Sequence, residues 1–336
     1  MKKPLQVGKV PPEILRQCLA SNAITDPRVV VGPRVGEDAA VIDFGNSYLV
    51  AKTDPITFAT DRIGWYSIHI NANDIATMGA CPRWFLGTVL FPEGQTDEAL
   101  VRQIFEDIRS SCRELDIELV GGHMEITYEM PRTIVIGQML GEVAKDKLVR
   151  NENGRPGDDV LLTKGIAVEA TSIIAREKGE ELAGTFDEEL LARCRDFLTN
   201  PGLSVVRDCL TANAAASVHA MHDPTEGGLA AGLRELAEAA GCGIRVDADR
   251  IPVFEECEAL CRHFGLDPLG VIASGALLLA VDPADTETVL HALGSEGIRA
   301  QAIGKLTEPS EGLTMASAGT VRELPVFPAD EIAKLF

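Results

Sequence analysis

Residues 68–82, IHINANDIATMGACP, are the stretch that most constrains how this chain folds. Apolar residues recur there at helical spacing and predict a helix with one buried face that ends at a Met-Gly-Ala turn. Asn71, Asn73 and Asp74 lie on this helix, and the angle of Asn73 and Asp74 aims both side chains into a cleft. Such a polar set suits a hard cation, while solvation or capping of a helix end explains it equally well. The choice depends on other acids in the chain.

Two more acids stand at the edges of predicted strands. Residues 29–55 read as strand, turn and strand; Asp38 directly precedes an apolar strand, and Asp54 follows the next one. Taken singly, an acid at a strand end is often only a turn former. Together with Asp74, these acids predict an oxygen-ligand set from neighbouring elements that suits magnesium.

Composition limits the possible partners. The chain has 336 residues, 46% of them hydrophobic, which is ample for a large core and indicates about two domains. A formal net charge of −20 argues against binding to nucleic acid, and a polyanionic substrate would require a metal. The N-terminal residues lack the apolar core of a secretory signal, and no later run approaches about 18 uninterrupted apolar residues. We therefore expect a soluble cytoplasmic protein with no membrane partner.

A glycine pair stands in the first half of the chain. After an amphipathic helix over residues 96–115 and a short strand, Gly121 and Gly122 predict a turn. Paired glycines let the backbone approach a ligand closely, and the following His123 is either a ligand contact or a polar group satisfied at a strand end.

The segment over residues 144–159 is charged and rich in turn formers, and it follows a long apolar strand. It indicates an N-terminal domain over residues 1–150 and a C-terminal domain over residues 151–336. The second domain alternates predicted strands and helices, as an α+β domain does.

A second glycine pair follows an acid in the C-terminal domain. Asp223 ends a short predicted strand, and Gly227 and Gly228 precede a helix. An acid and a glycine pair at a helix start form a candidate phosphate or metal site, because the helix N-terminus offers free N–H groups. The alternative is a simple capping turn, with Thr225 or Asp223 as the cap.

Eight cysteines are scattered through the chain without paired C-x-x-C motifs, so they predict neither a disulfide framework nor a zinc site. Cys257, Cys261 and His263 form the one cluster with the residue types of a metal site. The apolar spacing of residues 254–264 explains this cluster as packing.

Several motifs occur in one order along the chain: GEDAAVI, TDPIT, NDIATMGA, GGHME, TKGIAVEAT, HDPTEGGL, ASGALLLAV and IGKL. This series resembles the superfamily of aminoimidazole ribonucleotide (AIR) synthase, selenophosphate synthetase, thiamine-monophosphate kinase and the hydrogenase maturation factor HypE. The resemblance spans nearly the whole chain and looks closest to the HypE branch. No P-loop, dinucleotide-binding or zincin motif competes with it.

The resemblance implies a two-domain α+β fold of the AIR-synthase type, with a three-layer α-β C-terminal domain. It implies Mg-ATP bound between the domains and a homodimer formed through N-terminal strands. By motif, four acids would hold Mg2+ and phosphate: Asp38, Asp54, Asp74 and Asp223. The other ATP-binding residues would be Asn73, Gly121, Gly122, His123, Gly227 and Gly228.

Two features depart from the pattern of these relatives. Where they usually place an acid and then a threonine after the glycine turn, this chain has His123 and Met124. HypE-type enzymes end in a tail whose terminal cysteine is carbamoylated and then dehydrated, whereas the last cysteine of this sequence is Cys261. We therefore expect the acceptor to be a free small molecule or a side chain of another protein.

The leading functional expectation is a HypE-like, Mg-ATP-dependent enzyme that phosphorylates an amide or similar oxygen. One alternative is a direct small-molecule kinase like the thiamine-monophosphate branch. Another is a non-catalytic, ATP-binding maturation or regulatory partner.

Overall fold

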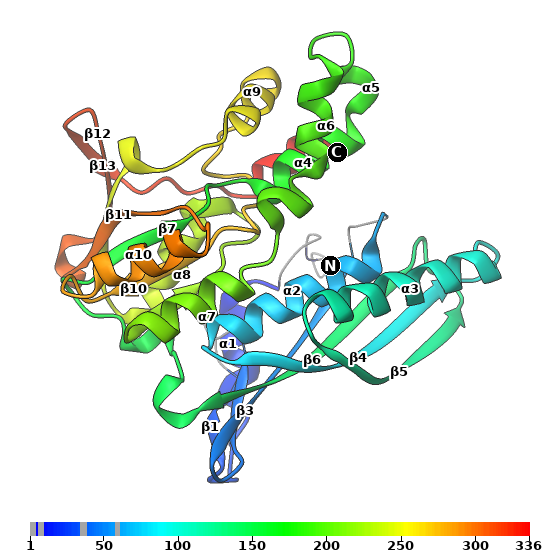
Figure 1. Cartoon of the computed structure of the whole chain (residues 1–336), viewed down its shortest axis with the longest axis horizontal. Helices are drawn as coiled ribbons and strands as arrows, with labels where there is room; N and C mark the ends of the chain where they lie inside the picture. The colour runs from blue at the N-terminus through cyan, green and yellow to red at the C-terminus, as the bar shows by residue number, and fades with distance from the viewer. Residues whose placement is uncertain (1–4, 6–9, 34–38, 58–60) are drawn as a thin grey trace, which may run out of the picture.

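The computed structural model describes residues 5, 10–33, 39–57 and 61–336 and contains two separate β-sheets (Figure 1). Asp38 lies outside the described residues, so its predicted place beside the other acids stays a prediction. No helix in the described part of the chain is long and apolar enough to cross a bilayer.

The first sheet has the strand order β1-β2-β3-β6-β4-β5, in which only the β4–β5 pair is parallel. Its strands are β1 (Val29–Val31), β2 (Ala40–Asp43), β3 (Ser47–Ile56), β4 (Cys81–Pro92), β5 (Glu118–Thr127) and β6 (Ile134–Ala144). The helices of this part are α1 (Pro12–Ala20), α2 (Ile63–Thr77) and α3 (Glu98–Glu114). Helices α2 and α3 lie on one face of the sheet, which confirms that both predicted helices exist (Figure 1). The prediction of one buried face for α2 is wrong, because nearly all of its residues are buried between the sheet and the C-terminal domain.

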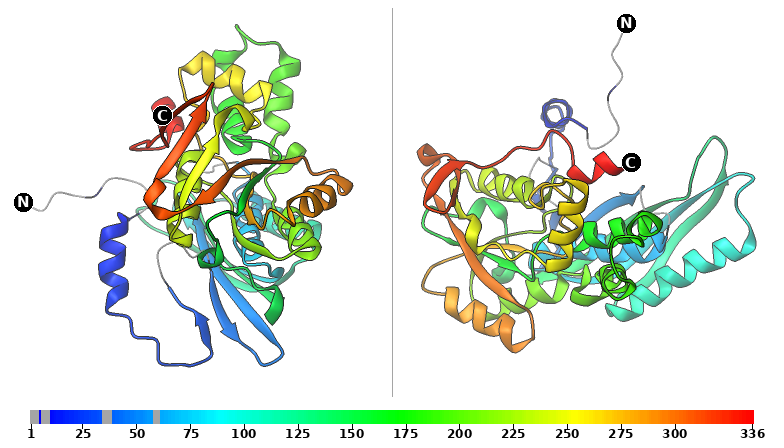
Figure 2. Two further views of the ribbon diagram at one scale, coloured as in Figure 1. Left: turned by 90° about the vertical axis from the view of Figure 1, so that its left-hand side faces the viewer. Right: turned by 90° about the horizontal axis from the view of Figure 1, so that it is seen from above.

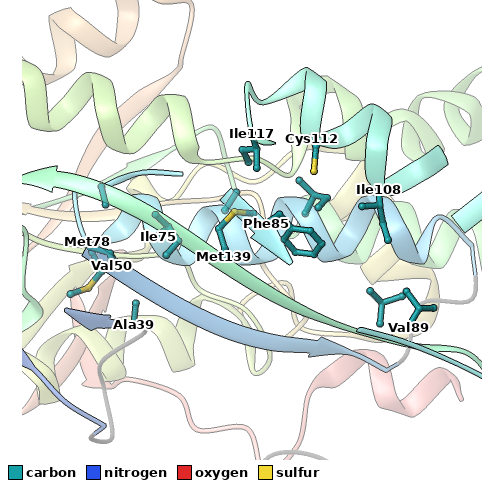
Figure 3. Close-up of a cluster of buried hydrophobic side chains, with 14 of the residues drawn as sticks. Ala39, Val50, Ile75, Met78, Phe85, Val89, Ile108, Cys112, Ile117 and Met139 are labelled. Carbon is teal, nitrogen blue, oxygen red and sulfur yellow. The ribbon is translucent and has the colours of Figure 1, made fainter. Parts of the chain in front are cut away.

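Side chains alternate between the two faces of the sheet along each strand, so every second residue faces α2 and α3. Phe85 of β4 and Met139 of β6 point to the helix side and are fully buried against α2 and α3 (Figure 3). Ile108 and Cys112 of α3 complete the same core. The intervening strand residues lie on the opposite face, where the sheet is only half-buried.

The predicted turn at Gly121 and Gly122 is wrong, because both residues lie inside β5, which pairs with β4 along most of its length. A Cβ atom added at Gly122 would lie 2.2 Å from the carbonyl oxygen of Gly87. The glycine is therefore required by close approach of two strands.

The second sheet has the order β13-β12-β9-β11-β7-β10-β8. Its strands are β7 (Asp159–Thr163), β8 (Val218–His222), β9 (Gly243–Asp247), β10 (Leu278–Val281), β11 (Ala300–Thr307), β12 (Leu313–Ser317) and β13 (Thr320–Glu323). Helix α8 (Gly228–Ala240) packs on one face, and α7 (Val206–Ala215) and α10 (Thr286–Ser295) pack on the other. This arrangement confirms the predicted α+β class and the three-layer C-terminal domain.

A separate cluster of helices stands beside the second sheet. It contains α4 (Val168–Glu177), α5 (Gly179–Leu182), α6 (Glu188–Asp196) and α9 (Glu255–Phe264). The C-terminal turn η6 (Glu331–Leu335) lies beside these helices (Figures 1 and 2). Cys257 and Cys261 are buried in this cluster with their Sγ atoms 3.9 Å apart, which confirms packing as their role.

Candidate functional site

The two domains meet where the end of α2 lies beside α7 (Figure 1) and also contacts β8 of the second sheet. Ala76 of α2 packs in one core cluster, which we call the interdomain contact, with Val205, Cys209, Met221 and Leu277 of the C-terminal domain. This contact positions the two best candidate acids.

Asp74 precedes Ala76 by one half-turn of α2, and Asp223 follows Met221 directly after β8. Their exposed fractions are only 6% and 3%. Buried carboxylates are costly unless a cation or hydrogen-bond donor compensates them. The structure therefore places an acid from each domain beside the interdomain contact.

Asp74 forms an ion pair that the sequence analysis missed. The Nζ atom of Lys52 lies 3.1 Å from Oδ2 of Asp74, and both side chains are largely buried. Lys52 and Asp54 are alternate residues of β3, so both point toward α2. The Asn71 amide also reaches the Asp54 carbonyl oxygen, at 3.4 Å. The β3–α2 contact thus carries both predicted acids, and strand alternation was the available signal for Lys52.

Asn73 connects the domains. Its Nδ2 donates to the carbonyl oxygen of Leu203 at 3.1 Å, and its Oδ1 accepts from the N–H of Val205 at 2.9 Å. The side chain is fully buried. The structure therefore gives Asn73 a role in holding residues 203–205, and its predicted support of a nucleotide stays a prediction.

The same segment is held from the other side by Lys164, which follows β7. Its ammonium group donates to the carbonyl oxygen of Ser204 at 2.6 Å and lies 3.4 Å from Oδ1 of Asp208. Burial lowers the pKa of Lys164, and the charge of Asp208 opposes that shift. Asn73 and Lys164 together fix the geometry of the interdomain contact.

The glycine turn before α8 is closed by a residue from the far end of the chain. The N–H of Gly227 donates to Oδ2 of Asp330 at 2.8 Å, and the N–H of Ile272 donates to Oδ1 at 3.2 Å. The predicted caps Thr225 and Asp223 are wrong, because neither side chain caps α8. Asp330 is 103 residues from Gly227, so no local pattern could identify it. Burial raises the pKa of Asp330, and its three backbone hydrogen bonds oppose the shift.

Gly228 is required by close packing at the same turn. A Cβ atom there would lie 2.5 Å from the carbonyl oxygen of Leu269, and the residue has a positive φ of 70°. The turn is thus packed tightly against residues 269–271.

Within one chain, Gly121 and Gly122 do not lie beside the acids of the candidate site. Asp54 pairs with Gly137, which pairs with Gly87, which pairs with Gly122. Three strand spacings separate Asp54 from Gly122, on the order of 14 Å. His123 is exposed on β5, with its Nε2 3.3 Å from Glu125.

The carboxylates of the candidate site match the oxygen ligands that magnesium prefers. Within the described ranges, no three His, Cys, Asp or Glu side chains are grouped closely enough to hold a metal ion. Magnesium is usually held by one or two carboxylates together with water and substrate phosphates. The buried oxygens of Asp74 and Asp223 fit that shared coordination rather than a cage made only of protein ligands.

Comparison with protein families gives matches over both domains. The N-terminal domain of AIR synthase related proteins matches residues 36–143, and the C-terminal domain matches residues 155–315. A putative hydrogenase expression/formation protein of Methanocaldococcus jannaschii is 28% identical, over 91% of this chain and 90% of its own length. The carbamoyl dehydratase HypE of Rhizobium leguminosarum is 30% identical, over 80% of this chain and 76% of its own length.

Solved structures share the fold. HypE in a HypE–HypF complex has a TM-score of 0.76 and 22% identity, with coverage of 94% of this chain and 99% of HypE. HypE in complex with ATP has a TM-score of 0.72 and 22% identity, with coverage of 95% and 91%. These matches confirm the AIR-synthase-like fold and the family resemblance identified in the sequence.

Proposed function

The chain belongs to the AIR synthase-related family, and from this premise we propose that it is a HypE-like, Mg-ATP-dependent enzyme. The proposed reaction phosphorylates an amide-type or similar oxygen and so activates it for a later step. The HypE relative is named a carbamoyl dehydratase, and a solved HypE contains ATP, which supports this reaction class.

One observation carries the proposal: Asp74 and Asp223 are both buried, and each stands two residues from Ala76 or Met221, which pack together at the interdomain contact. Both acids would hold a metal shared with ATP phosphates, beside the Lys52 ammonium group that already pairs with Asp74. When bound, Mg-ATP supplies the transferable phosphoryl group, and the metal neutralises charge that develops on it.

The chain's own residues would bind and orient the nucleotide. Asp74 and Asp223 would hold the metal, with Asp38 and Asp54 as further oxygen donors. Asn73 would keep the domains in register through its bonds to residues 203–205. The Gly227 N–H already bonds to Asp330, so a phosphate that reached this amide would displace that carboxylate.

We also propose that the protein is a homodimer that pairs through the face of the first sheet opposite α2 and α3. Apolar side chains on that face are half-buried in the single chain. They are Trp84, Leu86, Leu90, Ile136 and Leu140. A second copy would cover them.

In this proposal, the phosphoryl acceptor is not carried by a cysteine of this sequence. Cys257 and Cys261 are packed in α9, and the pKa of Cys257 is raised by the neighbouring Cys261 and by burial. A buried thiol with a raised pKa is a poor nucleophile. Mass spectrometry after incubation with carbamoyl phosphate, ATP and a carbamoyltransferase tests this point. A carbamoyl or cyano adduct on any of the protein's own cysteines would contradict it.

The reaction class is tested by phosphate release from ATP with and without a panel of amides. Amide-stimulated release without a stable phosphorylated product supports the proposal. A stable phosphorylated product identifies a kinase instead, and ATP binding without any release identifies a non-catalytic partner.

A further inference from the structure

Helix α4 begins with a carboxyl group that the proposed metal site does not use. Glu169 is 7% exposed, and its Oε2 is buried without a hydrogen bond to any residue in the described part of the chain. Its N–H donates to the carbonyl oxygen of Ser274 at 3.3 Å. The buried hydroxyl of Ser274 faces the carboxyl group without completing a hydrogen bond of normal geometry.

Glu169 lies behind the turn that carries Asp223. The N–H of Ala273 donates to the carbonyl oxygen of Thr225 at 3.1 Å and so joins the Ser274 loop to that turn. Because the N–H of Glu169 is bonded to the Ser274 loop, backbone hydrogen bonds join the start of α4 to the turn that follows Asp223.

Several charged and titratable groups face this carboxyl from the surrounding elements. Glu226 approaches from the turn before α8, and Asp330 approaches from the C-terminal segment. Burial raises the pKa of Tyr66 in α2, the nearby charge of Glu169 adds to the shift, and Arg176 of α4 opposes it. Glu169 therefore stands between the two domains, on the side where α2 faces the C-terminal domain.

Burial raises the pKa of Glu169 to about 7, Ser274 opposes the shift, and the charges of Glu226 and Asp330 add to it. A buried carboxylate without a full set of donors destabilises a fold, and a glutamine would fill the same space without that cost. The buried carboxyl group of Glu169 thus destabilises the fold, and it is suited to taking up and releasing a proton near neutral pH.

We propose that Glu169 is a catalytic residue of the candidate site, where it takes the proton that the phosphoryl acceptor loses. This inference rests on the proposed function. The acceptor oxygen forms a bond to the γ-phosphorus, and the bond from that phosphorus to the β–γ bridging oxygen breaks, so ADP leaves. The proton on the acceptor, from an amide nitrogen or from water, passes to the Glu169 carboxylate and later returns to solvent.

The test uses the full-length protein with ATP, Mg2+ and water as the acceptor. Glu169→Gln keeps the size of the side chain and removes the proton-carrying group. We expect it to lower the kcat of ATP hydrolysis by roughly 10²-fold or more. The wild-type kcat rises with pH through about 7, and the variant loses this rise. Glu169→Asp retains part of the rate and the pH dependence.

Two controls separate catalysis from folding and from nucleotide binding. Glu177→Gln makes the same chemical change at an exposed position of α4 and keeps the wild-type rate. Calorimetry with a non-hydrolysable ATP analogue and Mg2+ should give the same Kd for Glu169→Gln as for the wild type, with thermal unfolding as a check of the fold.

The outcomes are distinct. A Glu169→Gln protein that hydrolyses ATP within about threefold of the wild-type rate and keeps its pH profile overturns the role of Glu169. A wild-type protein that neither binds the analogue nor releases phosphate overturns the proposed function and this inference with it. Weaker analogue binding by Glu169→Gln, in proportion to its loss of rate, makes the residue structural and also overturns the inference.

Discussion

The ammonium nitrogen of Lys52 lies 3.1 Å from a carboxylate oxygen of Asp74. One residue belongs to β3 and the other to α2, and their side chains are 19% and 8% exposed. The cationic side chain of Lys52 thus already lies beside Asp74, the acid to which we assign a metal ion. Removing that cation should leave a buried charge that Mg2+ can compensate.

Lys52→Met tests this relationship because it keeps the length of the side chain and removes its charge. We expect the free energy of unfolding to fall by about 2 kcal/mol, since the pair is largely, but not fully, buried. Adding Mg2+ should then raise the Tm of Lys52→Met more than the Tm of the wild type. The control is Lys305→Met, which breaks the more exposed ion pair with Asp159. Equal effects of Mg2+ on the two variants would remove the argument for a cation site at Asp74.

Asp330 is expected to stabilise the C-terminal domain through the hydrogen bonds that it accepts from Gly227, Ile272 and Ile332. Asp330→Ala should lower the free energy of unfolding by roughly 1.5–3 kcal/mol, because three backbone N–H groups lose their acceptor. Urea unfolding measures the change. Asp146→Ala, at an exposed position, serves as the control and should change little. An unchanged urea midpoint for Asp330→Ala would show that these three hydrogen bonds do not stabilise the fold.

His69 of α2 should make the fold sensitive to acid. Burial lowers its pKa from 6.5 to about 3, and the charge of Arg62 adds to this effect. The carboxylate of Glu114 is 3.9 Å from Nε2 and largely exposed, so it offers little compensation. Between these pH values the unfolded chain binds a proton that the folded chain rejects, so stability is lost as the pH falls.

The loss from His69 should reach about 1.4 kcal/mol per pH unit within that window. His69→Phe keeps a ring against Trp65, whose centroid is 3.9 Å from the imidazole. Urea unfolding between pH 4 and pH 7 should show a flatter dependence for His69→Phe than for the wild type. Parallel curves for the two proteins would assign the acid sensitivity to other groups.

A charged residue on the half-buried apolar face of the first sheet should disrupt the proposed dimer. Leu86→Arg should convert a dimer into a monomer at micromolar concentration, because a guanidinium group cannot be buried unpaired in an apolar interface. Sedimentation equilibrium measures the mass. Val321→Arg, on the exposed strand β13, should leave the dimer intact. A wild-type monomer, or a dimeric Leu86→Arg, would place the interface elsewhere or exclude it.

Local patterns in the sequence predicted the elements that carry Asp54 and Asp74. Helix α2 and strand β3 have clear apolar spacing, and an acid beside such a pattern is visible without a structure. Asn73 was found for the same reason, but its bonds to Leu203 and Val205 depend on the packing of two domains. No local pattern reports such a contact.

The errors have a common cause. The pair Gly121 and Gly122 has the composition of a turn, yet the close approach of Gly87 from another strand decides its conformation. A partner for the turn before α8 was sought among neighbours of Gly227, but the side chain that binds the Gly227 N–H is Asp330. Both features are set by residues distant in sequence, whereas the ion pair of Lys52 could have been suspected from strand alternation.

The most direct test of the proposed function is Mg2+-dependent ATP turnover by Asp74→Asn and Asp223→Asn. Each change keeps the shape of the side chain and removes one charge at the interdomain contact. We expect each variant to keep its circular dichroism spectrum and to lose roughly 10²-fold or more in kcat, because the metal loses a carboxylate ligand. Asp146→Asn should hydrolyse ATP at the wild-type rate. Wild-type turnover by either Asp74→Asn or Asp223→Asn would contradict the metal site and the function built on it.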